Sequence, residues 1–229
     1  MVDTHRLQTT SAGMLLVVEL AARLAERAGG VTTILEVSTY LPMDVESVAR
    51  VMEGVETLDE VEVVKVEGLE SVKVANGERF RRELGEALLD GVKLDEIPEL
   101  ARSVGALKRN ERWLKTVRGQ HELLHLVAES GQRIVDLSYL EGRAQVPRAR
   151  IQGLLNDFDA AGYIEVEYDE DVGELSYRFP ELDYGEKRFR QNMEQIDTAE
   201  PPVRSRRSVW GILAIVAAVV LVIIIVLRW

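Results

Sequence analysis

Residues 131–182 read GQRIVDLSYLEGRAQVPRARIQGLLNDFDAAGYIEVEYDEDVGELSYRFPEL, and their order of polar and apolar residues indicates the fold class. It predicts a short helix over 135–142, a turn, and a longer helix over 147–161. The longer helix opens with proline, which suits the first turn of a helix. Strand-like residues follow over 163–168 and 174–179. The stretch therefore predicts two helices joined by a turn and followed by a β-hairpin.

The same pattern occurs a second time, 103 positions earlier in the chain. Displacing the sequence by that number places Glu19 on Glu122, and apolar residues then fall on apolar residues without a gap as far as Val63, which falls on Val166. The matches follow helical spacing first and strand spacing later, as two copies of one fold require. We therefore expect a structural repeat.

The first copy has the same elements in the same order. A helix over 11–28 ends at two glycines, a short helix follows over 32–40, and Asp44 is expected to cap the next helix. Two strands, over 61–66 and 70–75, close the copy around a tight turn.

The second copy resembles the winged helix-turn-helix superfamily. The resemblance extends over the stretch quoted above, with a helix that ends in AAGYIEV and a hairpin that returns as SYRF. The first copy is similar but matches less clearly. The resemblance implies two tandem winged-helix domains. Because such domains bind DNA, RNA or proteins, it implies a fold and leaves the function open.

Five regions follow from this interpretation. The two copies occupy 11–76 and 113–181, and a helical connector joins them over 77–112. A juxtamembrane tether follows over 182–208, and 209–229 predicts a single transmembrane helix. The expected fold class is mainly α with small β-hairpins (α+β), with one membrane span at the C-terminus.

The tether contains EKRFRQNMEQI, a candidate helix, followed by a polar segment with two prolines. Roughly 20 residues of flexible chain have a mean reach of about 25 Å, so we expect the domains to stay near the membrane.

The C-terminal region carries the clearest signal in the chain. From Val209 to Leu227 no residue is charged, and at about 1.5 Å per residue this run nearly crosses a hydrocarbon core of about 30 Å. Trp210 and Trp229 are expected to anchor it at the interfaces. Basic residues before the span predict cytoplasmic domains, with the C-terminus on the far side, and are expected to contact lipid headgroups. They are Arg204, Arg206 and Arg207.

Residues 121–125 read HELLH and match the HExxH pattern of zinc metalloproteases, in which both histidines bind zinc and the glutamate is the general base. On a helix, His121 and His125 fall on the charged face, opposite an apolar arc, so we expect ordinary surface positions. A third ligand is missing at zincin spacing, since Glu129 lies about 12 Å along the axis from His121. We expect no metal and no cofactor.

Composition narrows the classes of function further. The chain of 229 residues has no cysteine, which excludes disulfides, Cys-ligated zinc, iron–sulfur clusters and thiol nucleophiles. Its formal net charge of −11 disfavours broad affinity for phosphate backbones. The sequence has no glycine-rich phosphate loop and no nucleophile elbow, so no catalytic residue is predicted.

The helix after each turn is the expected contact surface of a helix-turn-helix. In the first copy this helix is acidic and would repel DNA. The second copy carries candidate donors to phosphates, base edges or a partner. They are Arg143, Arg148, Arg150, Gln152 and Asn156. The hairpin of the second copy is acidic, with Glu167 and Glu174 where a DNA-binding wing would carry cations.

Two functions follow from these patterns, and a third is remote. The leading expectation is a membrane-anchored interaction or scaffold module without enzymatic activity, whose partners are the lipid bilayer and an unidentified protein. The alternative is a membrane-tethered transcription regulator whose second domain reads DNA. The remote alternative is the HExxH protease. Ala214 and Ala218 form a small-xxx-small pair in the predicted span, which leaves a homo-oligomer open.

Overall fold

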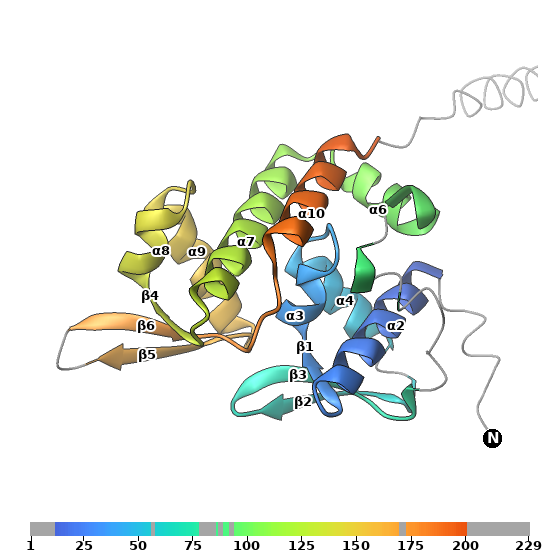
Figure 1. Ribbon diagram of the computed structural model, residues 1–229, viewed down its shortest axis with the longest axis horizontal. Helices are drawn as coiled ribbons and strands as arrows, with labels where there is room; N and C mark the ends of the chain where they lie inside the picture. The colour runs from blue at the N-terminus through green and yellow to red at the C-terminus, as the bar shows by residue number, and fades with distance from the viewer. Residues whose placement is uncertain are drawn as a thin grey trace, which may run out of the picture.

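The protein is described by a computed structural model over residues 12–55, 58–77, 86, 89–91, 94–169 and 173–200. In these ranges it is an α+β protein with eight α-helices, one 3-10 helix and two antiparallel sheets of three strands each (Figure 1). The expected α+β class is therefore confirmed at this level.

The predicted span, 209–229, lies outside the described residues, and so do the predicted lipid contacts Arg204, Arg206 and Arg207 and the anchors Trp210 and Trp229. Within the described ranges, every helix is too short or too polar to cross a bilayer.

The first unit contains six elements around one small sheet. They are α2 (Ala12–Arg27), β1 (Val31–Thr33), α3 (Ile34–Thr39), α4 (Val45–Val55), β2 (Val61–Val66) and β3 (Leu69–Val74). The sheet order is β1-β3-β2. Asp44 caps α4 as predicted, because its Oδ1 accepts a hydrogen bond from the Ser47 main-chain N–H at 2.9 Å.

The second unit contains the same six kinds of element. They are α7 (Glu111–Ser130), β4 (Ile134–Asp136), α8 (Leu137–Arg143), α9 (Arg148–Ala160), β5 (Glu165–Asp169) and β6 (Glu174–Arg178). The sheet order β4-β6-β5 repeats that of the first unit. Helix α7 ends at Gly131, whose φ of 64° is the left-handed conformation that glycine adopts readily.

The strand registers of the two units are equivalent. Val63 lies opposite Val72 in the first hairpin, and Val166 lies opposite Tyr177 in the second. The offset is therefore 103 positions up to the first hairpin strand and 105 in the second, so the second hairpin has a turn two residues longer. The first turn is the tight one, with Gly68 at a φ of 87°.

The short strands β1 and β4 were not predicted. The pattern over 32–40 predicted one continuous helix, but its first residues belong to β1, which pairs with β3. In the same way β4 takes the start of 135–142 and pairs with β6. A strand of three residues is stabilised by pairing with a strand far along the chain, and the local sequence pattern does not indicate that pairing.

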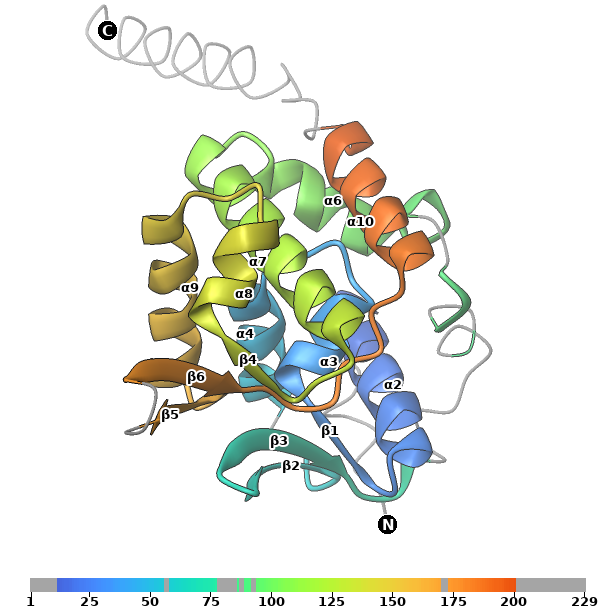
Figure 2. The same cartoon turned by 60° about the vertical axis from the view of Figure 1, so that its left-hand side comes forward.

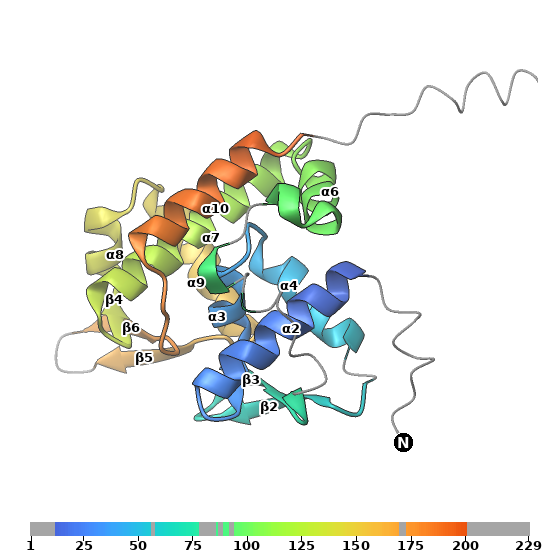
Figure 3. The same cartoon turned by 45° about the vertical axis from the view of Figure 1, so that its right-hand side comes forward.

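The two units share one hydrophobic core. Helix α6 (Pro98–Leu107), which follows the 3-10 helix η2 (Leu94–Glu96), contributes Val104 to it, and α10 (Glu186–Thr198) contributes Ile196. Figure 3 shows α10 lying along α7. The candidate helix EKRFRQNMEQI is present as α10, and the predicted tether is part of the folded body as far as the end of this helix.

Candidate interaction surfaces

Helix α4, expected to face outward, forms the junction between the two units. Six of its residues are buried, and α7 of the second unit holds its N-terminus. Gln120 Oε1 accepts a hydrogen bond from the Val45 main-chain N–H at 3.0 Å, and Gln120 Nε2 donates to both carboxylate oxygens of Glu46 at 2.9 Å. The N-terminus of α4 is therefore occupied by the second unit, while Arg50 and Glu53 further along the helix remain exposed.

A second link ties the same end of α4 to α7. Trp113 Nε1 donates to Asp44 Oδ2 at 2.5 Å, and both side chains are buried. Burial by itself would raise the pKa of Asp44, but the hydrogen bonds from Ser47 and Trp113 outweigh it and hold that pKa below its ordinary value. Asp44 is thus an ionised cap that joins the two units.

The histidines of HELLH are not on the solvent face, so that prediction is wrong. His121 is 1% exposed, because the segment before α10 and α10 itself cover this side of α7. Its Nε2 lies 2.9 Å from the Met43 carbonyl oxygen, which can only accept, so Nε2 carries the proton. Nδ1 then accepts from the Tyr184 hydroxyl at 2.6 Å. Asn192 Nδ2 in turn donates to the Tyr184 hydroxyl oxygen at 3.2 Å.

His125 joins the same cluster from the next turn of α7. Its Nδ1 lies 3.1 Å from the Tyr184 carbonyl oxygen, its Nε2 lies 2.8 Å from Glu186 Oε2, and its ring stacks on Phe189 with centroids 4.4 Å apart. Both imidazoles thus use both ring nitrogens: His121 contacts Met43 and Tyr184, and His125 contacts Tyr184 and Glu186 at the start of α10. No group of three metal-ligating side chains occurs in the described ranges. In this arrangement HELLH joins parts of the body, and neither ring offers a free nitrogen to a metal.

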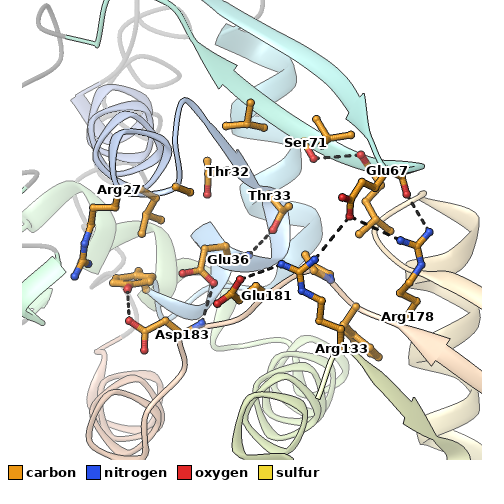
Figure 4. Close-up of a pocket in the computed structure, with 18 residues that line it drawn as sticks. Arg27, Thr32, Thr33, Glu36, Glu67, Ser71, Arg133, Arg178, Glu181 and Asp183 are labelled. Carbon is orange, nitrogen blue, oxygen red and sulfur yellow. Dashed lines mark hydrogen bonds and ion pairs between the residues drawn. The ribbon is translucent and has the colours of Figure 1, made fainter. Parts of the chain in front are cut away.

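A cleft of about 540 Å³ lies where the first sheet meets the chain after β6 (Figure 4). At one side of it Arg133 pairs with Glu181 at 3.0 Å, and Arg178 donates to the main-chain oxygen of Glu67 at 3.0 Å. The contact of Arg178 with Glu67 joins the first hairpin to the second unit, and Arg133 Nη1 also lies 3.7 Å from Glu67 Oε2. The charged groups on this side of the cleft are therefore occupied with one another.

The other side of the cleft holds a perturbed carboxyl group. Burial raises the pKa of Glu36 to about 7, and the nearby charge of Asp183 acts in the same direction. The Asp183 main-chain N–H donates to Glu36 Oε2 at 3.1 Å, and the Tyr40 hydroxyl donates to the Asp183 carboxylate at 3.2 Å. Perturbed carboxyl groups in clefts occur at functional sites, but this one serves as an acceptor between the units.

The predicted contact residues of the second unit separate into two groups. Arg148, Gln152 and Asn156 recur at intervals of four and lie along one side of α9, which is mostly exposed. Arg150 lies on another side and donates to Thr116 Oγ1 of α7 at 2.5 Å. The structure therefore brings together three of the five predicted residues on one stripe of α9.

The arginines near this stripe already have partners. Arg148 Nε lies 2.9 Å from Glu141 Oε1, and the guanidinium of Arg143 lies 4.0 Å from the centroid of the Tyr139 ring. An arginine that binds DNA would have to exchange such a contact for a phosphate or a base edge. The surface is therefore less cationic than the sequence alone suggests.

The second hairpin has an exposed apolar face that the sequence analysis did not single out. Directly paired residues share a face, so Val166 lies beside Tyr177, and Tyr168 lies beside Leu175 two positions closer to the turn. Tyr177 belongs to the core, whereas Val166 is 38% exposed, Leu175 is 42% exposed and Tyr168 is 62% exposed. We call Val166, Tyr168 and Leu175 the apolar hairpin face. These side chains lie on the same face of the hairpin as the buried Tyr177, but beyond the helices that cover Tyr177.

A comparison with models of known protein families finds no match to this chain, and a search of curated proteins finds none either.

Proposed function

We propose that the protein is a membrane-anchored interaction module that binds a protein partner through its second unit, without a catalytic step. In this proposal each unit is a winged-helix domain, the C-terminal apolar run is the anchor, and the domains face the cytoplasm. The order helix, strand, helix, helix and two strands, with the last strand central in the sheet, supports the winged-helix assignment, because both units have it.

The observation that carries the proposal is the difference between the two hairpins at equivalent positions. Where the second hairpin has Tyr168 opposite Leu175, the first has Lys65 opposite Glu70. A hairpin that faces only solvent is commonly stabilised by such a pair of opposite charges on neighbouring strands. The second hairpin instead exposes an aromatic and an aliphatic side chain, which is typical of a binding surface.

The surroundings of the apolar hairpin face favour a basic protein partner. Burial raises the pKa of Tyr177, and the charges of Asp159, exposed near the end of α9, and of Glu141 act in the same direction, so negative charge lies beside this face. Glu167 and Glu174 are exposed on the same two strands but on the opposite face of the sheet. Negative charge here would repel a phosphate backbone, whereas it complements lysine and arginine around an apolar anchor. We therefore place a protein, and not DNA, on this surface.

Site-specific photo-crosslinking in the full chain, in its membrane, tests the proposal. A photoreactive residue in place of Tyr168 is expected to capture a protein. The matched control replaces Ile134, which is 45% exposed but lies on the opposite face of the same sheet. The adduct at position 168 should also disappear when Leu175→Glu is added. Equal adducts from both positions, or none from position 168, would overturn the proposal.

The alternative, DNA binding by α9, is supported by the stripe of Arg148, Gln152 and Asn156. A mobility assay with duplex DNA over a range of salt concentrations separates the two functions. Binding that weakens steeply with salt, and that is lost with Arg148→Ala and Asn156→Ala together, would favour the DNA-binding function. We expect no such binding.

A further inference from the structure

A basic groove lies at one end of the body, between the start of α7 and the start of α9. It has a volume of about 1040 Å³, and Val146 and Pro147 form part of its lining. Its charged lining side chains are basic except for Glu111. The basic residues are Arg109, Arg112, Lys115, Arg118 and Arg150. This concentration of positive charge occurs on a chain whose formal net charge is −11.

The body itself balances only part of this charge. Arg118 forms an ion pair with Asp197 of α10, and Arg150 donates a hydrogen bond to a threonine of α7. The side chains of Arg112 and Lys115 are exposed and have no ion pair with any residue that the structure describes. The groove therefore offers cationic groups to an anion from outside.

The last turn of α10 lies beside the groove. Lys108 donates to the main-chain oxygen of Asp197, and Arg118 pairs with the carboxylate of the same residue. Figures 1 and 2 both show the end of α10 and the start of α7 at one end of the body, and the hairpin of β5 and β6 toward the other. The chain therefore leaves the described body at the end where the groove lies.

The length of the remaining chain limits how far this end can lie from a membrane. About ten residues separate the end of α10 from the predicted span, and a chain of that length reaches at most about 35 Å. With the span in a bilayer, the groove lies within reach of the lipid headgroups, and the apolar hairpin face lies toward the opposite end of the body.

We propose that the basic groove binds the headgroups of anionic lipids in the bilayer that holds the predicted span. Binding fixes the orientation of the body, so that the apolar hairpin face points away from the membrane toward a soluble partner. A cation close to an anionic surface is worth roughly a five-fold change in binding, and Arg112 and Lys115 together are worth up to about 30-fold. The inference rests on the proposed anchor, but it concerns a different set of residues from the three arginines before the span.

A lipid headgroup suits the groove better than a nucleic acid does. A headgroup presents one or two negative charges and can enter a concave site of this size. Duplex DNA carries a charge about every 1.7 Å and would extend beyond the groove over a body that is negative as a whole. Nucleic acid is therefore an outcome of the test and not part of the proposal.

The test uses the full chain reconstituted in vesicles of phosphatidylcholine alone or mixed with phosphatidylglycerol. Because the chain has no cysteine, Gln145→Cys provides a single labelling site in the groove, and Gln132→Cys provides one beyond the opposite end of α7. Energy transfer from the label to a fluorescent lipid headgroup reports the distance to the membrane. We expect transfer from position 145 to be greater in the anionic vesicles, to fall with added salt, and to exceed transfer from position 132.

The decisive variant is Arg112→Gln with Lys115→Gln, which should reduce transfer from position 145 in anionic vesicles to the value in phosphatidylcholine. Its matched control is Lys65→Gln with Lys73→Gln, which makes the same change in charge on the first hairpin. An equal effect of the two pairs would mean that net charge, and not the groove, is responsible, and would overturn the inference. Transfer that is independent of lipid composition would overturn it as well.

Two further readouts keep the groove separate from the anchor. Flotation of the full chain with phosphatidylcholine vesicles tests the anchor alone. If the chain does not float with them, the proposed anchor is wrong. Binding to anionic vesicles that is lost with Arg112→Gln and Lys115→Gln would then still support the groove, and absence of such binding would contradict it. If Arg112→Gln with Lys115→Gln abolishes binding to duplex DNA and leaves energy transfer unchanged, the groove is a nucleic-acid site and the inference fails.

Discussion

The two units have the same elements and equivalent strand registers, yet they expose opposite amounts of the same surface. In the first unit the N-terminus of α4 and part of the hairpin are bound by the second unit, while in the second unit the start of α9 and the hairpin remain open. The first unit therefore uses part of its surface to bind the second unit, whose equivalent surface stays exposed. Which copy is available to a partner depends on what packs against it, and the scaffold itself does not decide this.

The largest expected effect comes from His121 of HELLH, whose equivalent in the first unit is apolar. Val18 is the equivalent of His121, and both side chains are buried. His121→Val gives the second unit the residue of the first, but it leaves the Met43 carbonyl oxygen without a donor and Tyr184 without its acceptor. We expect a loss of about 2–4 kcal/mol in the free energy of unfolding, measured by denaturant titration of the full chain in detergent.

Glu129→Ala is the matched control for this prediction, because Glu129 is exposed on the same helix. It should change stability by less than about 0.5 kcal/mol. An equally small effect of His121→Val would contradict the view that the histidine joins α7 to α10.

The next effect concerns Glu36, whose equivalent in the second unit is Tyr139. Glu36 is partly buried and has a pKa raised from 4.5 to about 7, whereas Tyr139 lies under a guanidinium group. The folded chain holds the Glu36 proton more tightly than the unfolded chain does, so this group lowers stability as the pH rises from about 4.5 to 7. Glu36→Gln should therefore stabilise the protein by about 2 kcal/mol at pH 8 and change little below pH 4.

His121 should produce the opposite slope over nearly the same range. Burial lowers its pKa from 6.5 to about 4, so the unfolded chain binds the proton more tightly and stability increases as the pH rises between those values. The two slopes offset each other in the natural protein. Denaturant titrations as a function of pH should show a rising curve for Glu36→Gln and a falling curve for His121→Val. Parallel curves for both variants would contradict these assignments.

A smaller effect is expected where the helices α4 and α9 begin. Asp44 caps α4 and accepts from Trp113, whereas its equivalent, Pro147, has no side-chain cap. Trp113→Phe keeps most of the buried ring but removes the donor to an ionised group. We expect a loss of about 1.5 kcal/mol, with the pKa of Asp44 moving upward, measured by thermal unfolding and by titration of the carboxyl resonance. An unchanged Asp44 pKa would argue against this link between the units.

The sequence predicted elements well where the pattern is local and poorly where the partner is distant. The helix expected over 147–161 is present as α9, and the strand expected over 61–66 is present as β2, because periodicity alone decides such elements. The helical wheel of α7 placed its apolar arc correctly in the core, but it put His121 on the solvent face. It could not reveal that Tyr184, about 60 positions later, supplies a polar partner that allows His121 to be buried, or that Asn192 donates to the same tyrosine hydroxyl.

A signal for this docking was nevertheless present. Phe189, Asn192, Met193 and Ile196 recur at spacings of three and four and line the side of α10 that faces the body. The sequence analysis predicted this helix but assigned it to the tether, and the polar Asn192 interrupts the apolar stripe. The apolar hairpin face was missed for a related reason: each strand alternates as a half-buried strand should, and the sequence does not indicate that the core ends before the hairpin does.

The smallest effect on stability is expected at the positions that matter most for the proposed function. Tyr168→Lys with Leu175→Glu gives the second hairpin the charged pair of the first, Lys65 and Glu70. Because both replaced side chains are largely exposed, the free energy of unfolding should change by less than about 0.5 kcal/mol. With the photoreactive residue at position 166, which leaves positions 168 and 175 available for substitution, the same variant should abolish the crosslink to the partner.

The matched control is Tyr177→Ala, two positions from Leu175 on the same face but inside the core, which should destabilise the protein by about 3 kcal/mol. If the exposed pair proved as costly as the buried tyrosine, the hairpin face would be part of the fold, and the difference between the two units would lie only in their packing.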